Sequence, residues 1–228
     1  MIRLFLELQK SENKQLYREM LYAVGAMSRL SSESSIPYLG YREVENIFCL
    51  AFGAENLSRS DCSADASKDR IGIGIKTFLN GNGRTLQKIA EFNRDSSLFR
   101  GKTPKEIVQI VSNLRNERIR ATKRIHGLDE LIYHCVVREE GKIKVFECPM
   151  DEIDIKGIKN INAGTKNIIA FEDGKNEYSF NLSKSTLYKR FITENVLLDI
   201  DVNIIENPFE VLRNLFKESA GKLRFAPI

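Results

Sequence analysis

A short segment in the first third of the chain constrains the fold most, because it joins an acidic turn to an alternating apolar strand. Residues 61–76 read DCSADASKDRIGIGIK. Ile71, Ile73 and Ile75 recur with the period of two that predicts a β-strand of the core. Glycines fill the positions between them, which indicates a close approach of another part of the chain. The segment therefore predicts a hairpin whose acidic residues lie beside Lys76.

The chemistry of this hairpin depends on Asp65 and Lys76, which we expect at the same end of two adjacent strands. A carboxylate holds a hard cation through oxygen, and the cation activates water and stabilises a phosphate under attack. A lysine beside it orients the nucleophile or offsets developing charge. Asp61 is expected on the same side of the strand as Asp65. The alternative is an ordinary polar turn with a surface lysine, but a lysine at a buried strand end needs a partner.

These residues resemble the PD-(D/E)xK nucleases of the restriction-endonuclease superfamily over roughly residues 40–140. The family pattern is an Asp that opens the second core strand, followed by an acidic residue, a spacer and a Lys on the third. Asp65 and Lys76 match the first and last positions, with ten residues between them. The middle position is Gly74, so the pattern departs from the family there.

Some members of this family carry the acid further along the chain, on a helix. Glu91, in QKIAEFN, follows Lys76 after fourteen residues and resembles such a displaced ligand. Glu43 and Glu45, in YREVENIF, are expected on the helix before the hairpin, where many members carry a further acid. The resemblance thus implies Asp65, Lys76 and Glu91 as catalytic residues. It implies Asp65, Glu91 and Glu45 as ligands of Mg²⁺, which prefers carboxylates, phosphate oxygens and retained waters.

The resemblance also implies an endonuclease that hydrolyses double-stranded DNA, similar to a type II restriction enzyme. Twofold symmetric DNA sites favour dimeric readers, so a homodimer is expected. One alternative is a catalytically inactive DNA-binding module of the same fold, which Gly74 favours. Others are an adaptor that uses the C-terminal strands for protein contacts and a nuclease that acts on RNA, although no aromatic stacking platform is visible.

A basic stretch supplies the candidate DNA-binding surface. Residues 102–124 hold seven basic and two acidic residues, a charge of +5, so the rest of the chain carries about −1 of the net +4. Such a stripe suits phosphate binding, and Arg and Asn also read base edges. The alternative is a solvated helix face with internal ion pairs. The expected nucleic-acid contacts are Arg115, Asn116, Arg118, Arg120, Lys123, Arg124 and Lys184.

The order of elements predicts a mixed α/β (α+β) domain with one central mixed sheet, flanked by helices and extended by C-terminal hairpins. Helices are expected at 11–30, 41–52, 85–92, 103–125, 183–191 and 208–217, with a strand at 196–205. Hairpin turns are expected at 140–141 and 173–174. We expect a nuclease core at 1–150 and a β-rich extension of the same domain at 151–228. The sequence at 220–228, AGKLRFAPI, resembles the start of a further domain.

Composition excludes several classes of protein. No apolar run has the length of a membrane span, and the N-terminus lacks the pattern of a signal peptide, so a cytoplasmic protein is expected. The four cysteines form no CxxC pair, which favours reduced thiols. A zinc site from Cys62, His134, Cys135 and Cys148 lacks the usual ligand spacing.

Overall fold

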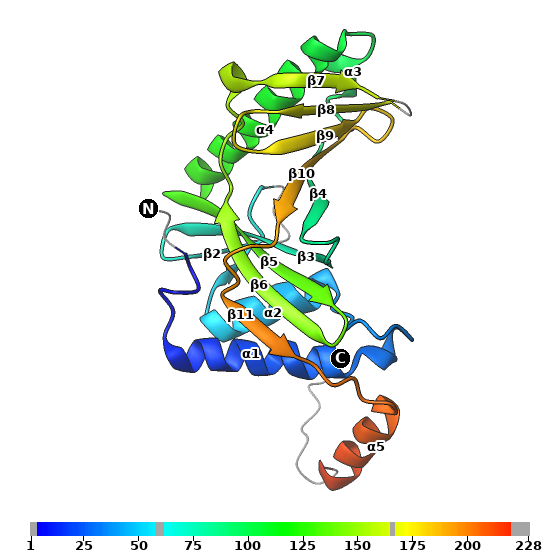
Figure 1. Cartoon of the computed structure of the whole chain (residues 1–228). Coiled ribbons are helices and arrows are strands. Elements are labelled where there is room, and N and C mark those ends of the chain that lie inside the picture. The colour runs from blue at the N-terminus through cyan, green and yellow to red at the C-terminus, as the bar shows by residue number, and fades with distance from the viewer. Residues whose placement is uncertain (1–3, 58–61, 165–166, 220–228) are drawn as a thin grey trace.

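The computed structural model describes residues 4–57, 62–164 and 167–219, which form a mixed α/β protein with two sheets and five helices. Figure 1 shows the two sheets as separate layers, joined where β4 and β10 run between them. The elements are α1 (Ser11–Ala26), η1 (Ser28–Leu30), α2 (Tyr41–Phe52), β1 (Glu55–Asn56), β2 (Ala66–Lys68), β3 (Ile71–Leu79), β4 (Arg84–Glu91), α3 (Ser96–Phe99), α4 (Pro104–His126), β5 (Glu130–Glu139), β6 (Lys142–Pro149), η2 (Ile155–Gly157), β7 (Lys159–Ala163), β8 (Ile168–Glu172), β9 (Glu177–Asn181), β10 (Thr186–Ile192), β11 (Leu198–Asp201) and α5 (Pro208–Ser219).

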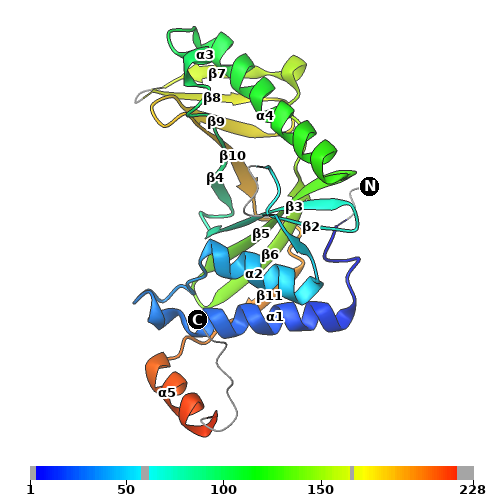
Figure 2. The same ribbon diagram turned by 180° about the vertical axis from the view of Figure 1, so that it is seen from behind.

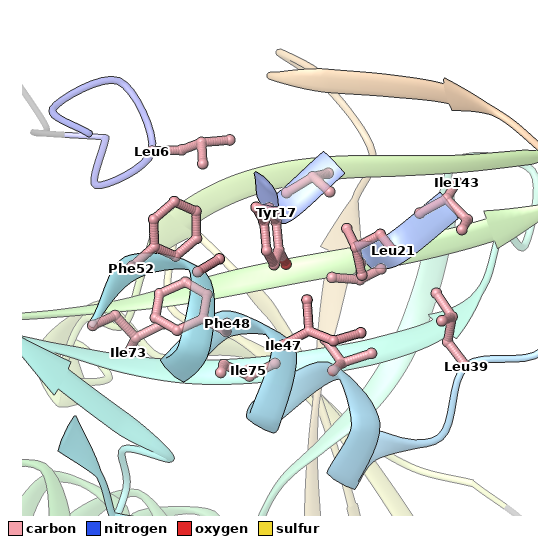
Figure 3. Packing of buried hydrophobic residues seen from close by; sticks show 14 of the residues in the cluster. Leu6, Tyr17, Leu21, Leu39, Ile47, Phe48, Phe52, Ile73, Ile75 and Ile143 are labelled. Atoms are coloured by element: carbon pink, nitrogen blue, oxygen red, sulfur yellow. The ribbon is translucent and has the colours of Figure 1, made fainter. Parts of the chain in front are cut away.

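The first sheet contains six strands within the described ranges, in the order β1-β2-β3-β5-β6-β11. Strands β3 and β5 pair in parallel, and the other neighbours pair antiparallel. Helices α1 and α2 lie side by side on one face of this sheet (Figures 1 and 2). Because β3 is central and alternates isoleucine with glycine, its isoleucines pack against the helices. In Figure 3, Ile73 and Ile75 lie close to the rings of Tyr17, Phe48 and Phe52.

The second sheet contains five antiparallel strands in the described residues, in the order β4-β10-β9-β8-β7. The long helix α4 packs along it, as the view from behind shows (Figure 2). Phe92, Phe99, Val108 and Phe180 belong to the core between α3, α4 and this sheet. Each sheet therefore draws strands from both sides of residue 150, because β4 joins the second sheet and β11 the first.

Local signals determined several elements correctly. Thr103 caps α4: its side chain accepts from the Glu106 N–H, and the Glu106 carboxylate accepts from the Thr103 N–H, which is the capping box. The helix ends at Gly127 in the left-handed conformation. The hairpins β5–β6 and β8–β9 turn at Gly141 and Gly174, which both have positive φ.

Three predictions of local structure are wrong. The chain forms two sheets and not one central sheet. Residues 85–92 are not a helix, because β4 pairs with β10 along its whole length. Residues 183–191 are not a helix either: Ser185 has a positive φ in a tight turn, and β10 follows at once. In both cases the strands are stabilised by a partner from the other half of the chain.

The described residues contain no helix with both the length and the apolar character needed to cross a bilayer. The predicted terminal segment at 220–228 and Asp61 lie outside the described residues.

Candidate active site

Asp65 occupies the position that its spacing from Lys76 predicts. It directly precedes β2, and its backbone N–H donates to the Ile73 carbonyl at 2.8 Å in the antiparallel ladder. Its side chain folds over β3, where Oδ2 accepts from the Ile75 N–H at 2.7 Å. The carboxylate is thereby fixed beside the residue that precedes Lys76 in β3. One Asp65 oxygen thus accepts a backbone hydrogen bond, and the positive charge of Lys76 acts on the carboxylate.

A second acid reaches this position from helix α2. Glu45 is only 5% exposed, and its Oε2 accepts from Arg42 Nη1 at 2.8 Å, one turn earlier in the same helix. Burial raises the pKa of Glu45 and the negative charge of Asp65 raises it further, whereas Arg42 and Lys76 lower it. The charge of Asp65 thus acts on Glu45, although nineteen residues lie between them in sequence.

The positive charge of Lys76 acts on both acids. Burial raises the pKa of Asp65, and the positive charge of Lys76 is the largest opposing influence, followed by the Ile75 N–H. Lys76 also lowers the pKa of Glu45. In the described part of the chain it forms no ion pair at contact distance, so its charge acts on both acids through space. We call Glu45, Asp65 and Lys76 the acid–lysine cluster.

The charges of Glu45 and Asp65 also act on the neighbouring thiol of Cys49. It lies one helical turn after Glu45, and its pKa rises to about 11 because of burial and of the charges of Glu45 and Asp65. Two ionised carboxylates in a partly desolvated site repel each other, so a bound cation would stabilise this arrangement.

The cluster fits a magnesium ion better than a metal that takes its whole shell from the protein. Within residues 4–57, 62–164 and 167–219, no three His, Cys, Asp or Glu side chains are grouped to hold a metal. Mg²⁺ often uses one or two carboxylates and completes its shell with waters and substrate phosphate oxygens. Asp65 and Glu45 supply such a pair of carboxylates.

Gly74 lacks an acid for a steric reason. A Cβ on Gly74 would lie 2.4 Å from Met150 Cε and 3.3 Å from Tyr133 Cδ1, on the face of β3 away from α2. Both neighbours belong to the core on that face. A carboxylate there would be desolvated by apolar side chains, so the second acid comes from the helix.

The structure does not bring Glu91 to the cluster, which corrects the prediction of a displaced helix ligand. Glu91 ends β4 in the second sheet, and its carboxylate accepts from Lys88 at 3.2 Å and from Asn93. The side chain is surface-exposed. Glu43 is exposed as well, near the start of α2. Of the acids predicted from sequence, Glu45 is therefore the one that joins Asp65.

Two of the expected DNA contacts are internal. Arg115 and Asn116 are each only 2% exposed. Arg115 donates to Ser63 Oγ at 2.6 Å and to the Tyr133 hydroxyl at 2.8 Å. Asn116 exchanges two hydrogen bonds with the backbone of Ile153. The prediction that they read bases is wrong for this structure, because their polar groups hold α4 against the sheets.

The other basic residues lie nearer the surface. Arg118 donates to the Glu91 carbonyl at 2.8 Å and stacks over the Phe92 ring, while Arg120 pairs with Glu152 at 2.7 Å. Lys123 is half-buried, and Arg124 and Lys184 are exposed. Of the expected nucleic-acid contacts, Arg120, Lys123, Arg124 and Lys184 therefore offer charge to a partner without rearrangement of the core.

The zinc alternative is not supported, because His134 and Cys135 point to opposite faces of β5. His134 is fully buried beneath the helices, where Nδ1 contacts Glu147 Oε1 at 2.7 Å and Nε2 contacts the Tyr17 hydroxyl at 2.8 Å. This buried polar network was not predicted from the sequence. No local pattern identifies it, since its members come from three separate elements.

Comparison of the chain with protein-family models, with curated proteins and with solved structures found no match.

Proposed function

We propose that the protein is a Mg²⁺-dependent endonuclease that hydrolyses phosphodiester bonds of double-stranded DNA, similar to a type II restriction enzyme. The observation that carries this proposal is that Asp65 is fixed on β3 beside Lys76 by the Ile75 N–H, with the charges of Asp65 and Lys76 both acting on the buried Glu45 of α2. Structural ion pairs also perturb pKa values, but they do not usually place two carboxylates in mutual repulsion.

The arrangement of strands supports the resemblance to the PD-(D/E)xK nucleases. Asp65 directly precedes β2, Lys76 lies in the adjacent antiparallel strand β3, and Glu45 comes from the helix before them. These are the positions that the resemblance implies for the Asp, the Lys and a helical acid. We therefore propose a restriction-endonuclease-like fold for the first sheet and its helices.

Each residue of the cluster has a chemical role in the proposed reaction. Asp65 and Glu45 would hold Mg²⁺, which when bound polarises a phosphate and makes a bound water more acidic. The Ile75 N–H fixes the orientation of Asp65. The Lys76 ammonium, whose charge acts on both acids, would orient the attacking water or offset negative charge that develops on phosphate. Arg42 holds Glu45 in place.

The test is a cleavage assay on duplex DNA with Mg²⁺, compared with the same reaction in EDTA. We expect Asp65→Asn, Glu45→Gln and Lys76→Met each to lower the rate by about 10²-fold or more, because each removes a group that acts on the reacting phosphate. Glu91→Gln is the matched control, since it removes an exposed acid outside the cluster and should cut as the parent does. Cleavage that needs Glu91 but not Glu45 would overturn the assignment.

A second candidate is a catalytically inactive DNA-binding module, which the absence of an acid at Gly74 favours. In that case the protein binds duplex DNA with a steep salt dependence but leaves it intact with Mg²⁺. Sedimentation of the complex tests the homodimer that a twofold symmetric site favours.

A further inference from the structure

A cavity of about 410 Å³ lies where the two sheets meet. Its walls come from the end of β6 in the first sheet and from β9 and β10 in the second, and Figure 1 shows β10 running down from the second sheet toward the first at this junction. Ligand sites favour such junctions, and the volume falls in the range of small-molecule pockets. The lining includes Pro149, Asp151, Lys175, Glu177, Lys189 and Arg190.

Lys189 is the unusual member of this lining. It is only 7% exposed, yet no carboxylate in the described ranges pairs with it at contact distance. Its ammonium donates one long hydrogen bond, 3.4 Å, to the Pro149 carbonyl. It also lies over the rings of Tyr133 and Phe191, 5.4 and 5.6 Å from their centroids. An ammonium has three donors, so burial leaves most of its hydrogen-bonding capacity unused.

The other charges of the cavity do not neutralise Lys189. Glu177 is held by Arg190 at 2.6 Å and by Arg84 at 2.5 Å, so its charge is already matched. Asp151, Lys175 and Glu194 are exposed at the rim, where water and salt screen them. The desolvated charge in the cavity wall is therefore positive.

Lys189 also lies near the acid–lysine cluster. Burial raises the pKa of Cys135, while the charges of Lys76 and Lys189 both oppose that rise. Cys135 lies opposite Lys76 in the parallel pair of β3 and β5. Two ammonium groups thus lie around one buried thiol, and the cavity is close to the proposed catalytic residues.

We propose that this cavity binds a phosphate-class oxyanion, with Lys189 as the charged group that holds it. An ammonium binds phosphate as a point charge, and a phosphate oxygen can accept the donors that the Pro149 carbonyl leaves unused. Phosphate chemistry is shared by inorganic phosphate, nucleotides and a nucleic-acid backbone. The inference concerns binding and does not depend on cleavage.

The first experiment measures thermal unfolding with inorganic phosphate, at constant ionic strength maintained with chloride. Phosphate should raise the melting temperature of the parent and of Lys159→Met, which removes an exposed lysine of the same second sheet outside the cavity. In Lys189→Met the shift should be lost, with affinity at least about tenfold weaker, and Lys189→Arg should keep it. An equal shift in Lys189→Met, or none in the parent, overturns the proposal.

The second experiment needs no variant, so it decides the matter if Lys189→Met does not fold. Lysines of the parent are acetylated and quantified by mass spectrometry. Phosphate should slow the acetylation of Lys189 and leave Lys159 unchanged, and unchanged acetylation of both overturns the proposal.

Binding of duplex DNA, measured in the presence of EDTA, then identifies the source of the oxyanion. Weaker duplex binding by Lys189→Met indicates a backbone phosphate, whereas a phosphate shift without a change in duplex binding indicates a small phosphate. Both outcomes support the site. Glu45→Gln should retain phosphate binding, so failure of the cleavage proposal and failure of this one are distinguishable.

Discussion

Replacing Tyr17 by Phe tests the buried network that holds α1 on the first sheet. A carboxylate only accepts hydrogen bonds, so Nδ1 of His134 donates to Glu147, and Nε2 makes its hydrogen bond with the Tyr17 hydroxyl at 2.8 Å. Tyr17→Phe keeps the ring and its packing but leaves Nε2 buried without a partner. We expect a loss of about 2 kcal/mol in the free energy of unfolding.

The assay is urea unfolding, with thermal unfolding beside it. For a chain of this size a loss of about 2 kcal/mol lowers the melting temperature by about 4–8 °C. Tyr22→Phe is the matched control, because Tyr22 lies on the same helix but is 40% exposed, and it should leave stability unchanged. In a double-mutant cycle with Glu147→Gln, coupling of about 0.5–3 kcal/mol is expected if the three groups act as one network. A Tyr17→Phe protein as stable as the Tyr22→Phe control would refute the reasoning.

Two further predictions concern the candidate active site. Gly74→Ala should destabilise the fold by about 1–3 kcal/mol, measured by urea unfolding, through overpacking against Met150. Adding Met150→Ala to the same chain should reduce that cost. If the losses of the two substitutions were simply additive, Met150 would not be the side chain that the new methyl group meets. Glu45→Gln should make the metal-free protein more stable at pH 7. The pKa of Glu45 is raised in the fold, so stability is lost as pH rises above the unfolded value near 4.5. The stability of the parent relative to Glu45→Gln should therefore fall as the pH rises above 4.5, and a rise would contradict the sign.

The same groups link metal binding to stability. Mg²⁺ that binds Asp65 and Glu45 offsets their repulsion, so its addition at pH 7 should raise the melting temperature of the parent. The increase should be absent in Glu45→Gln and present in the exposed control Glu91→Gln, measured in the same buffer with and without EDTA.

Signals confined to one stretch of sequence predicted the elements they belong to. The capping box of Thr103 and Glu106 and the left-handed Gly127 define the ends of α4 to within a residue, because caps satisfy backbone groups of the same helix. The turns at Gly141 and Gly174 required only a residue that tolerates positive φ. The spacing of Asp65 and Lys76 placed both at adjacent strands, because two antiparallel neighbours are connected by a short turn.

Long-range contacts decided the rest. Residues 84–91 suit a helix locally, but pairing with β10 about a hundred residues later makes them β4 and takes Glu91 away from Asp65. The sequence alone does not distinguish Glu45 from other acids expected on helices. The packing of α2 on β3 decides that Glu45 is the one that joins the cluster.

The same principle divides the basic residues of α4. The sequence by itself determined that a capped helix begins at Thr103 and ends before Gly127, and that residues 102–124 carry an excess of positive charge. Only the tertiary structure decided that Arg115 points into the core, where Ser63 and Tyr133 accept its hydrogen bonds, while Arg124 faces solvent. Charge is a property of the residue, whereas burial is a property of everything that packs around it.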